Sequence, residues 1–240
     1  MNVVTAHVRG AILRLASHTR ALELCARMNR ETEILDFIDK CAPGSILYDL
    51  GACEGRFAIY AALRGIHCYA FEPEALNFQT LLENMELNGV EVRRLIVPLK
   101  YAVGQTSQSG TIRIGQPWAG GHHRVVKGNG RVDLTFVSAL EQEIEIVSLD
   151  ELIGSGCLPP PDYLKVDVDG SELAFIQGSA ATLRRKELKA IIFELSDRDE
   201  NYRPILGLLN SCDFAVSRRY EIEPNLFNVW FKRRGRERIK

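Results

Sequence analysis

The sequence predicts an α/β protein with a doubly wound, mainly parallel sheet. Short apolar runs typical of buried strands recur along the chain, at 45–50, 67–71, 163–168 and 190–195. Stretches in which apolar residues recur at helical spacing separate these runs, and strands joined by helices pair in parallel. Such sheets bind ligands at the carboxyl ends of their strands, so we expect the chemistry to lie directly after these runs.

Composition excludes several classes of protein. A chain of 240 residues can bury a core without metal or disulfide support. The balance of 30 basic and 31 acidic residues argues against a polyanion binder, so no nucleic acid is expected as a partner. The six cysteines form no C-x-x-C pair and are typical of a cytoplasmic protein. No stretch of about 18 apolar residues occurs, so no membrane span is predicted.

Residues 1–40 are predicted to form a helical cap on the main domain. The apolar side chains of the first segment recur at helical spacing, which indicates one helix: Val4, Val8, Ala11, Ile12 and Leu15. A second short helix is expected from about Thr32. A turn signal at 41–44 separates this cap from the main domain at 41–232, and a basic tail follows at 233–240.

The elements of the main domain follow one another with few gaps. Further strands are expected at 92–97, 144–147, 214–219 and 227–231. Helices are expected at 56–63, from Pro73 to the Asn88-Gly89 pair, after Ser148, after Ser171 and at 202–209. The segment 104–141 is rich in glycine and has weak strand signals at 111–114 and 132–136, so we interpret it as an insertion or a lid.

Two features after the first strands favour a nucleoside-containing ligand. The loop Asp49-Leu-Gly-Ala-Cys-Glu-Gly55 has glycines that permit a sharp turn and a close helix entry, although a mere tight turn would look the same. It is not the G-x-G-x-x-G of dinucleotide binders. Glu72 follows the next strand, and its two oxygens can accept both hydroxyls of a ribose. The alternative is a glutamate favoured by a helix N-terminus.

Acidic residues gather after the strand at 163–168. Asp167, Asp169 and Glu172 lie within six residues, and Glu194 ends the adjacent predicted strand. Such acids repel one another, so we expect compensation by Lys165, by a cationic ligand or by a metal. The alternative for Asp169, and for Ser171 beside it, is that the residue merely caps a helix.

The glycine-rich insertion carries three further candidates. His122 and His123 are either a base or substrate contact on a mobile lid, or two exposed loop residues. Trp118 either stacks on a sugar or aromatic substrate, or anchors the loop. Cys53 has no histidine near it in sequence, so we interpret it as a small loop residue and not as a nucleophile.

The motifs together resemble a known family. Y-D-L-G-A-C-E-G-R, F-E-P-E, L-K-V-D-V-D-G-S-E and I-I-F-E-L, with S-L-D-E-L and N-V-W-F, are similar in order and spacing to the FkbM-type S-adenosylmethionine-dependent methyltransferases over about 30–232. This resemblance implies a seven-stranded Rossmann-like sheet whose last strand is antiparallel. It also implies S-adenosylmethionine as the cofactor.

The resemblance also implies roles for individual residues. Asp49, Gly51 and Gly55 would surround the methionine part of the cofactor, Glu72 would hold the ribose, and Ala102 would flank the adenine. The family usually has Asn where this chain has Cys53, so a side-chain contact is expected to be lost there while the backbone path is kept. The neighbours of these residues are expected to contact the cofactor as well: Ala52, Cys53, Pro73, Tyr101 and Asp167.

Two routes for the chemical step stay open. Asp167 is expected to face the sulfonium and the acceptor, with Trp118, Asp169 and Glu194 on the acceptor side. Carboxylates at two neighbouring strand ends resemble the magnesium site of catechol-type O-methyltransferases, where the ion lowers the pKa of the acceptor hydroxyl. Asp167 and Glu194 would then be the metal ligands. The rival route uses His122 or His123 as the base, without metal.

The leading interpretation is a methyltransferase that acts on a hydroxyl of a sugar, a glycolipid or a secondary metabolite. One alternative is a nicotinamide-dependent reductase, which the missing G-x-G-x-x-G and the missing Tyr-x-x-x-Lys pair disfavour. A second is a catalytically silent module that binds the cofactor or a protein partner, and the presence of Asp49, Glu72 and Asp167 counts against it. Oxygen and nitrogen acceptors are both left open, as is the oligomeric state.

Overall fold

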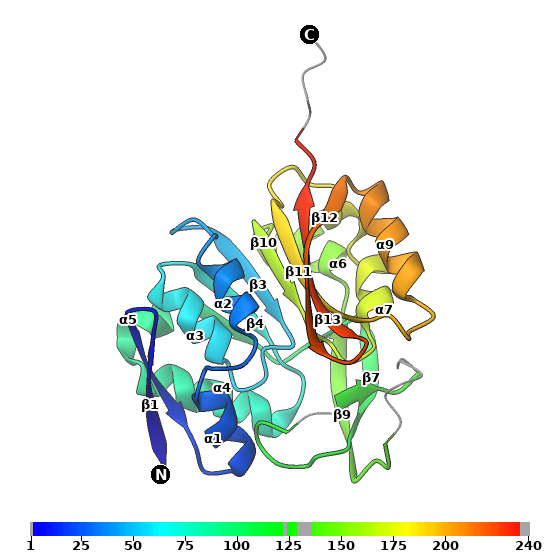
Figure 1. The fold of residues 1–240 in the computed structure, drawn as a ribbon. Coiled ribbons are helices and arrows are strands. Elements are labelled where there is room, and N and C mark those ends of the chain that lie inside the picture. Colours follow the sequence, from blue (N-terminus) through cyan, green and yellow to red (C-terminus); the bar gives the residue numbers. More distant parts are fainter. Residues whose placement is uncertain (1, 122–123, 129–135, 236–240) are drawn as a thin grey trace.

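The computed structural model describes residues 2–121, 124–128 and 136–235. A seven-stranded sheet at its centre confirms the predicted fold class (Figure 1). The strand order is β12-β13-β11-β10-β3-β4-β5, and β13 pairs antiparallel with both of its neighbours. The strands are β3 (Ile46–Leu50), β4 (His67–Phe71), β5 (Ile96–Leu99), β10 (Tyr163–Val166), β11 (Ala190–Ser196), β12 (Phe214–Glu223) and β13 (Leu226–Arg233). The chain winds outward in both directions from β3 and β10, so the switch point lies between these two strands.

Helices cover both faces of this sheet. On one face lie α2 (Thr32–Ile38), α3 (Arg56–Leu63), α4 (Ala75–Leu87) and α5 (Gly89–Arg94); on the other lie α6 (Leu149–Gly154), α7 (Glu172–Gln177), α8 (Ala180–Leu183) and α9 (Tyr202–Ser211). Successive side chains of a strand point to opposite faces. In β3, Leu47 therefore joins the first core and Tyr48 joins the second. Among the described residues no helix is both long enough and apolar enough to cross a bilayer.

The N-terminal segment corrects the expectation of a helix through 4–15. Residues Val3–Val8 and Ala11–Ala16 instead form an antiparallel hairpin, β1 and β2. The buried side chains alternate along each strand, and Arg9 and Gly10 both have positive φ, as a two-residue hairpin turn requires. Apolar residues this closely spaced fit both the helical period of about 3.6 residues and the strand period of 2, and the turn at 9–10 selects the strands. The cap is thus a hairpin followed by two helices, α1 (Arg20–Ala26) and α2.

Two expectations in the main domain also change. The strand expected at 92–97 is present but begins later, because helix α5 runs to Arg94 and β5 covers Ile96–Leu99. The helix expected after Ser171 is divided into α7 and α8 at Gly178. A Cβ atom on Gly178 would lie 2.0 Å from the carbonyl oxygen of Gly104, so the close approach of the insertion requires glycine there.

Many of the described residues of the glycine-rich segment and its flanks form a second sheet. Its strands are β6 (Ala102–Val103), β7 (Gln108–Ile114), β8 (Arg124–Val126) and β9 (Leu140–Val147), in the order β6-β9-β7-β8. They bury a small core of their own, which includes Ile112 and Ile146. The strand signal at 111–114 falls inside β7, while the one at 132–136 falls mainly outside the described residues. Figure 1 shows this sheet and α1 near the same end of the central sheet.

Candidate active site

A cleft of about 1380 Å³ opens at the carboxyl ends of the central strands. The expected cofactor residues that line it are Gly51, Ala52, Cys53, Glu72, Pro73, Tyr101, Ala102 and Asp167. The expected acceptor residues Trp118, Asp169 and Glu194 line the same cleft. Asp49 and Gly55 are not among its lining residues, and His122 and His123 lie outside the described part of the chain.

The loop between β3 and α3 turns sharply against β10. Gly51 has φ of 78°, and a Cβ atom added to it would lie 1.7 Å from the carbonyl oxygen of Asp167. Gly55 has φ of 83° and starts α3, where an added Cβ would lie 2.2 Å from Cδ1 of Leu81. Both glycines are therefore required by the backbone path, as the motif suggested. This path brings the main chain of residues 51–53 to the cleft wall.

Glu72 is a buried carboxyl group that shapes the floor of the cleft. Its Oε2 accepts a hydrogen bond from the backbone N–H of Cys53 at 2.9 Å, and its Oε1 accepts one from Glu74 at 2.9 Å. Burial raises the pKa of Glu72 to about 7, against the opposing effect of these donors. Each carboxylate oxygen has more than one lone pair, so Glu72 can still accept a ligand hydroxyl.

Lys165 supplies the positive charge that the acidic run required. Its Nζ lies 2.9 Å from Oδ1 of Asp49, 3.7 Å from Oδ2 of Asp167 and 3.0 Å from the carbonyl oxygen of Gly51. Burial alone would lower the pKa of Lys165, but the two carboxylates outweigh it and raise that pKa above its usual range. Asp49 is fully buried and does not line the cleft itself; it holds Lys165, which does.

Three carboxylates meet on one side of the cleft. Glu31, Asp167 and Glu194 each offer an oxygen atom, and these atoms lie within 4.8 Å of one another. Such hard oxygen atoms are suitable ligands for Mg²⁺. Asp167 and Glu194 were expected at this site from their sequence pattern, but Glu31 was not. Glu31 comes from the cap and precedes α2 with φ of 53°. Arg56 of α3 binds Glu31 and also Glu54, which ties the cap to the loop after β3.

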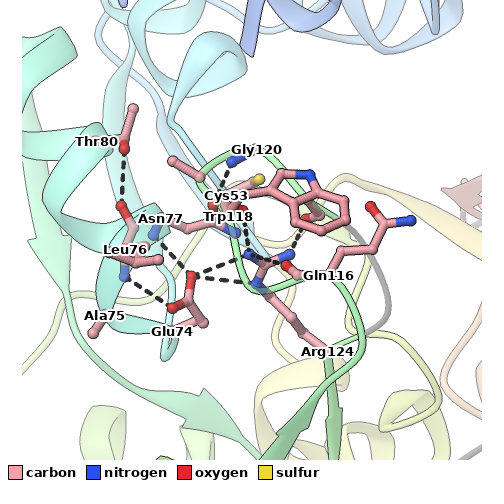
Figure 2. A network of polar contacts seen from close by, with 12 residues as sticks. Cys53, Glu74, Ala75, Leu76, Asn77, Thr80, Gln116, Trp118, Gly120 and Arg124 are labelled. Atoms are coloured by element: carbon pink, nitrogen blue, oxygen red, sulfur yellow. Dashed lines mark hydrogen bonds and ion pairs between the residues drawn. The ribbon is translucent and has the colours of Figure 1, made fainter. Parts of the chain in front are cut away.

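The loop at 116–121 brings the second sheet to the cleft. Trp118 is 45% exposed there, and the backbone N–H of Gly120 donates to Oδ1 of Asn77 at 2.8 Å. The buried guanidinium of Arg124 lies between this loop and Glu74 (Figure 2). Arg124 was not expected from the sequence, because an arginine in a glycine-rich segment forms no recognisable pattern by itself.

Cys53 is not activated as a nucleophile. Burial raises the pKa of its thiol well above the usual value, and the neighbouring carboxylates Glu54 and Glu72 act in the same direction. Burial likewise raises the pKa of Cys25, which also lines the cleft, to about 12. Both thiols are protonated at neutral pH, which agrees with the structural role expected for Cys53.

Comparisons with known proteins agree with this fold. A solved structure described as methyltransferase FkbM from Methylobacillus flagellatus superimposes with a TM-score of 0.51 at 18% identity, over 78% of this chain and 43% of that one. Precorrin-6y C5,15-methyltransferase from Geobacter metallireducens gives a TM-score of 0.51 at 11% identity, over 86% of this chain and 89% of that one. At these identities the similarity shows a shared fold.

The sequence comparisons are more specific. Hexuronic acid methyltransferase AglP from Haloferax volcanii is 29% identical over 147 residues, which make up 61% of this chain and 55% of that protein. The chain therefore matches little more than half the length of this curated relative. The model of the methyltransferase FkbM domain matches residues 49–216, a range that contains Glu72, Asp167 and Glu194. Because that match covers well over half of the sequence, the chain belongs to the FkbM methyltransferase family.

Proposed function

We propose that this protein transfers a methyl group from S-adenosylmethionine to a hydroxyl group on a sugar, a glycolipid or a secondary metabolite. The observation that carries the proposal is one cleft lined by the loop at 51–53, by Glu72, by the carboxylates around Asp167 and by Trp118. Membership of the FkbM family supports methyl transfer as the reaction.

The residues present fit this cofactor. In our proposal Glu72 accepts the two ribose hydroxyls, and the backbone of residues 51–53 lies beside the methionine part. Tyr101 and Ala102 bound the adenine. The carboxylates at Asp167 and Glu194 suit the positive charge of a sulfonium. When bound, S-adenosylmethionine would supply an electrophilic methyl group.

The chain's own residues would hold the acceptor and remove its proton. Methyl transfer is an in-line displacement, so the positioning of the acceptor oxygen supplies much of the acceleration. We propose that the exposed indole of Trp118 stacks on the acceptor and that Asp169 contacts it from the loop after β10. The methyl group would leave sulfur as its bond to the acceptor oxygen forms, and the hydroxyl proton would pass to a carboxylate at Asp167, Glu194 or Glu31, or to His122 or His123.

The name of the Haloferax relative suggests which acceptor to try first. That protein is described as acting on a hexuronic acid. We propose a sugar acceptor for this chain too, with nitrogen acceptors as the alternative outcome. A direct test is to incubate the protein with labelled S-adenosylmethionine and glucuronic acid, and then with fractionated metabolite extracts. Label in a methyl ether that survives mild alkaline hydrolysis supports the proposal, while label found only as an alkali-labile methyl ester of the carboxylate, or only on amines, contradicts transfer to a hydroxyl.

Magnesium is the finer part of the proposal. Asp167, Glu194 and Glu31 would hold the ion, which would lower the pKa of the acceptor hydroxyl. Loss of activity in a chelator that Mg²⁺ restores supports this route, and full activity in the chelator contradicts it. Glu194→Gln should raise the Mg²⁺ concentration that is needed for half-maximal activity. The matched control is Glu223→Gln, which changes a carboxylate that lines the cleft outside the cluster. It should leave the required Mg²⁺ concentration unchanged.

A further inference from the structure

One buried ion pair holds the loop that carries Trp118. Arg124 opens β8, and its side chain is 7% exposed. Its Nη2 lies 3.2 Å from Oε2 of Glu74 and its Nε lies 3.3 Å from the same oxygen. Glu74, with a side chain that is 3% exposed, precedes α4. Two charges this well buried need each other, because neither has water to solvate it.

The rest of the guanidinium binds the loop itself. Arg124 donates to the backbone carbonyl oxygens of Trp118 at 3.0 Å, of Gln116 at 3.5 Å and of Gly121. Figure 2 shows the guanidinium between the carboxylate of Glu74 and these carbonyl groups. Only the planar, five-donor fork of arginine can reach a carboxylate and several carbonyls together, whereas lysine offers a single point charge.

Other contacts fix the same loop from two sides. Oδ1 of Asn77 on α4 accepts from Gly120, and Oγ1 of Thr19, beside α1, donates to the carbonyl of Ala119 at 2.8 Å. The indole of Trp118 nevertheless remains 45% exposed and lines the cleft. The loop therefore presents an aromatic face to the cleft without needing to close over it.

The same network reaches the proposed ribose site. The backbone N–H of Glu74 donates to Oε1 of Glu72 at 2.9 Å, and the carboxylate of Glu74 accepts from two backbone N–H groups at the start of α4. On the other side, the backbone N–H of Arg124 donates to Oδ2 of Asp169 at 3.0 Å. Arg124 thus joins the loop after β4 to the loop after β10, with Trp118 between the two.

We propose that Arg124 is a positioning residue that, with Glu74, fixes Trp118 as a preformed platform for the acceptor at a set place relative to Glu72. The role of the platform in acceptor binding rests on the proposed function. The fixed position of Trp118 does not, so it is testable in the protein without any ligand.

The informative variant is Arg124→Lys. Arg124→Met would leave the buried carboxylate of Glu74 with its two backbone N–H donors but without a positive partner, and the protein could fail to fold. Lysine keeps the positive charge beside Glu74 but gives up most of the bonds to the loop carbonyls. Arg27→Lys is the matched control, because Arg27 is an exposed arginine at the C-terminal cap of α1 whose side chain pairs only with Glu23 among the described contacts.

Acrylamide quenching of tryptophan fluorescence measures how accessible the indole of Trp118 is, and so reports whether its loop is held in place. Trp230, the other tryptophan, is 2% exposed, and Trp230→Phe gives a background in which all the emission comes from Trp118. In that background we expect Arg124→Lys to raise the quenching constant by about twofold as the loop opens locally, and Arg27→Lys to leave it unchanged. Calorimetry with S-adenosylhomocysteine should show an affinity that stays within about twofold of the parent.

Enzyme kinetics distinguish a role of Arg124 in positioning Trp118 from a general effect of the substitution on folding. With glucuronic acid as the acceptor, Arg124→Lys should raise KM by about tenfold and leave kcat nearly unchanged, and its effect should not add to that of Trp118→Ala. Quenching that is the same in Arg124→Lys and Arg27→Lys overturns the proposal, as does an affinity for S-adenosylhomocysteine that falls together with thermal stability. If the parent protein does not methylate glucuronic acid, that acceptor assignment fails, and the quenching comparison still decides the role of Arg124.

Discussion

Glu72 occupies a position in which its own burial opposes its ionisation. Its pKa of about 7 lies well above its usual value of 4.5 because burial disfavours the charged form. A ligand that donates two hydroxyl groups to this carboxylate would favour the ionised form. The residue is therefore poised to change its charge near neutral pH when the cleft fills.

This pKa predicts how stability depends on pH. Between pH 4.5 and 7 the unfolded chain releases a proton that the folded protein keeps on Glu72, so this residue lowers stability as pH rises through that window and has no further effect above it. Glu72→Gln cannot titrate. Its stability should rise relative to the parent by up to about 3 kcal/mol from pH 4.5 to 7 and then level off. Urea unfolding of both proteins at several pH values measures this, and a difference that is constant in pH contradicts it.

The same residue predicts the pH dependence of ligand binding. The affinity for S-adenosylhomocysteine should fall as pH drops below about 7, because Glu72 must lose its proton to accept both ribose hydroxyls. Glu72→Ala should weaken binding by about 1.5–3 kcal/mol at pH 8, as expected for hydrogen bonds to a charged group. Calorimetry at pH 6 and pH 8 is the measurement. Unchanged affinity in the variant would remove the ribose role.

Gly51 carries a third prediction at the scale of single residues, with a matched control. Gly51→Ala combines a positive φ with a Cβ atom 1.7 Å from the carbonyl oxygen of Asp167, whereas Gly89→Ala has φ of 84° and nothing within 4 Å. We expect Gly89→Ala to lower the free energy of unfolding by about 1 kcal/mol. Gly51→Ala should lower it by about 3 kcal/mol or more and weaken cofactor binding. Equal losses in urea unfolding would show that the close approach of the two loops does not matter.

At the scale of elements, the N-terminal hairpin is attached to the main domain through α4. Oδ1 of Asn84 accepts from the backbone of Ala16 at 2.7 Å, while its Nδ2 donates to the carbonyl of Glu54 at 2.8 Å. One fully buried amide thus connects the hairpin to the loop after β3. Asn88, one turn later, bonds to the backbone of Arg14 in the same way but is partly exposed.

Asn84→Ala should therefore cost more stability than Asn88→Ala. It leaves a buried N–H and a buried C=O without partners, at about 1–3 kcal/mol each, whereas water can replace the bonds that Asn88 makes. Hydrogen exchange should also show faster opening of β2 in the first variant than in the second. Similar unfolding free energies and similar exchange in the two variants would mean that the hairpin is held by apolar contacts alone.

At the scale of the whole molecule, cofactor binding should stabilise the fold. The cleft is lined by the cap, the central sheet and the insertion, so a ligand that filled it would contact all three parts. S-adenosylhomocysteine at 100 times its Kd should add about 2.7 kcal/mol, which is a rise in Tm of roughly 5–10 °C for a domain of this size. Thermal shift measures this, with Glu72→Ala as the control. A shift with NADH and none with S-adenosylhomocysteine would favour the reductase instead.

Local patterns determined the central sheet. The helix at 56–63 and the strand at 67–71 were predicted with the bounds that the structure has, because each is a short apolar element between clear signals: Gly55 and Gly65 flank the helix, and Gly65 and Pro73 flank the strand. The order of those elements predicted the doubly wound parallel sheet, and the family resemblance implied its seven strands and its antiparallel last strand. From that order followed the edge where Gly51, Glu72 and Asp167 meet, since the carboxyl ends of parallel strands share one edge.

Only the tertiary structure decided what covers that edge. The sequence could not place Glu31 beside Asp167 and Glu194, because more than a hundred residues separate it from them and no local pattern records such a contact. The sequence pattern of the N-terminal hairpin indicates a helix, because a few apolar residues fit the helical and the strand period equally well. The turn between the two strands decides which period applies. Arg124 likewise has no motif, and its partners Glu74, Trp118 and Asp169 come from three separate segments. Contacts between segments far apart in sequence depend on how the whole chain packs, which local residue spacing does not specify.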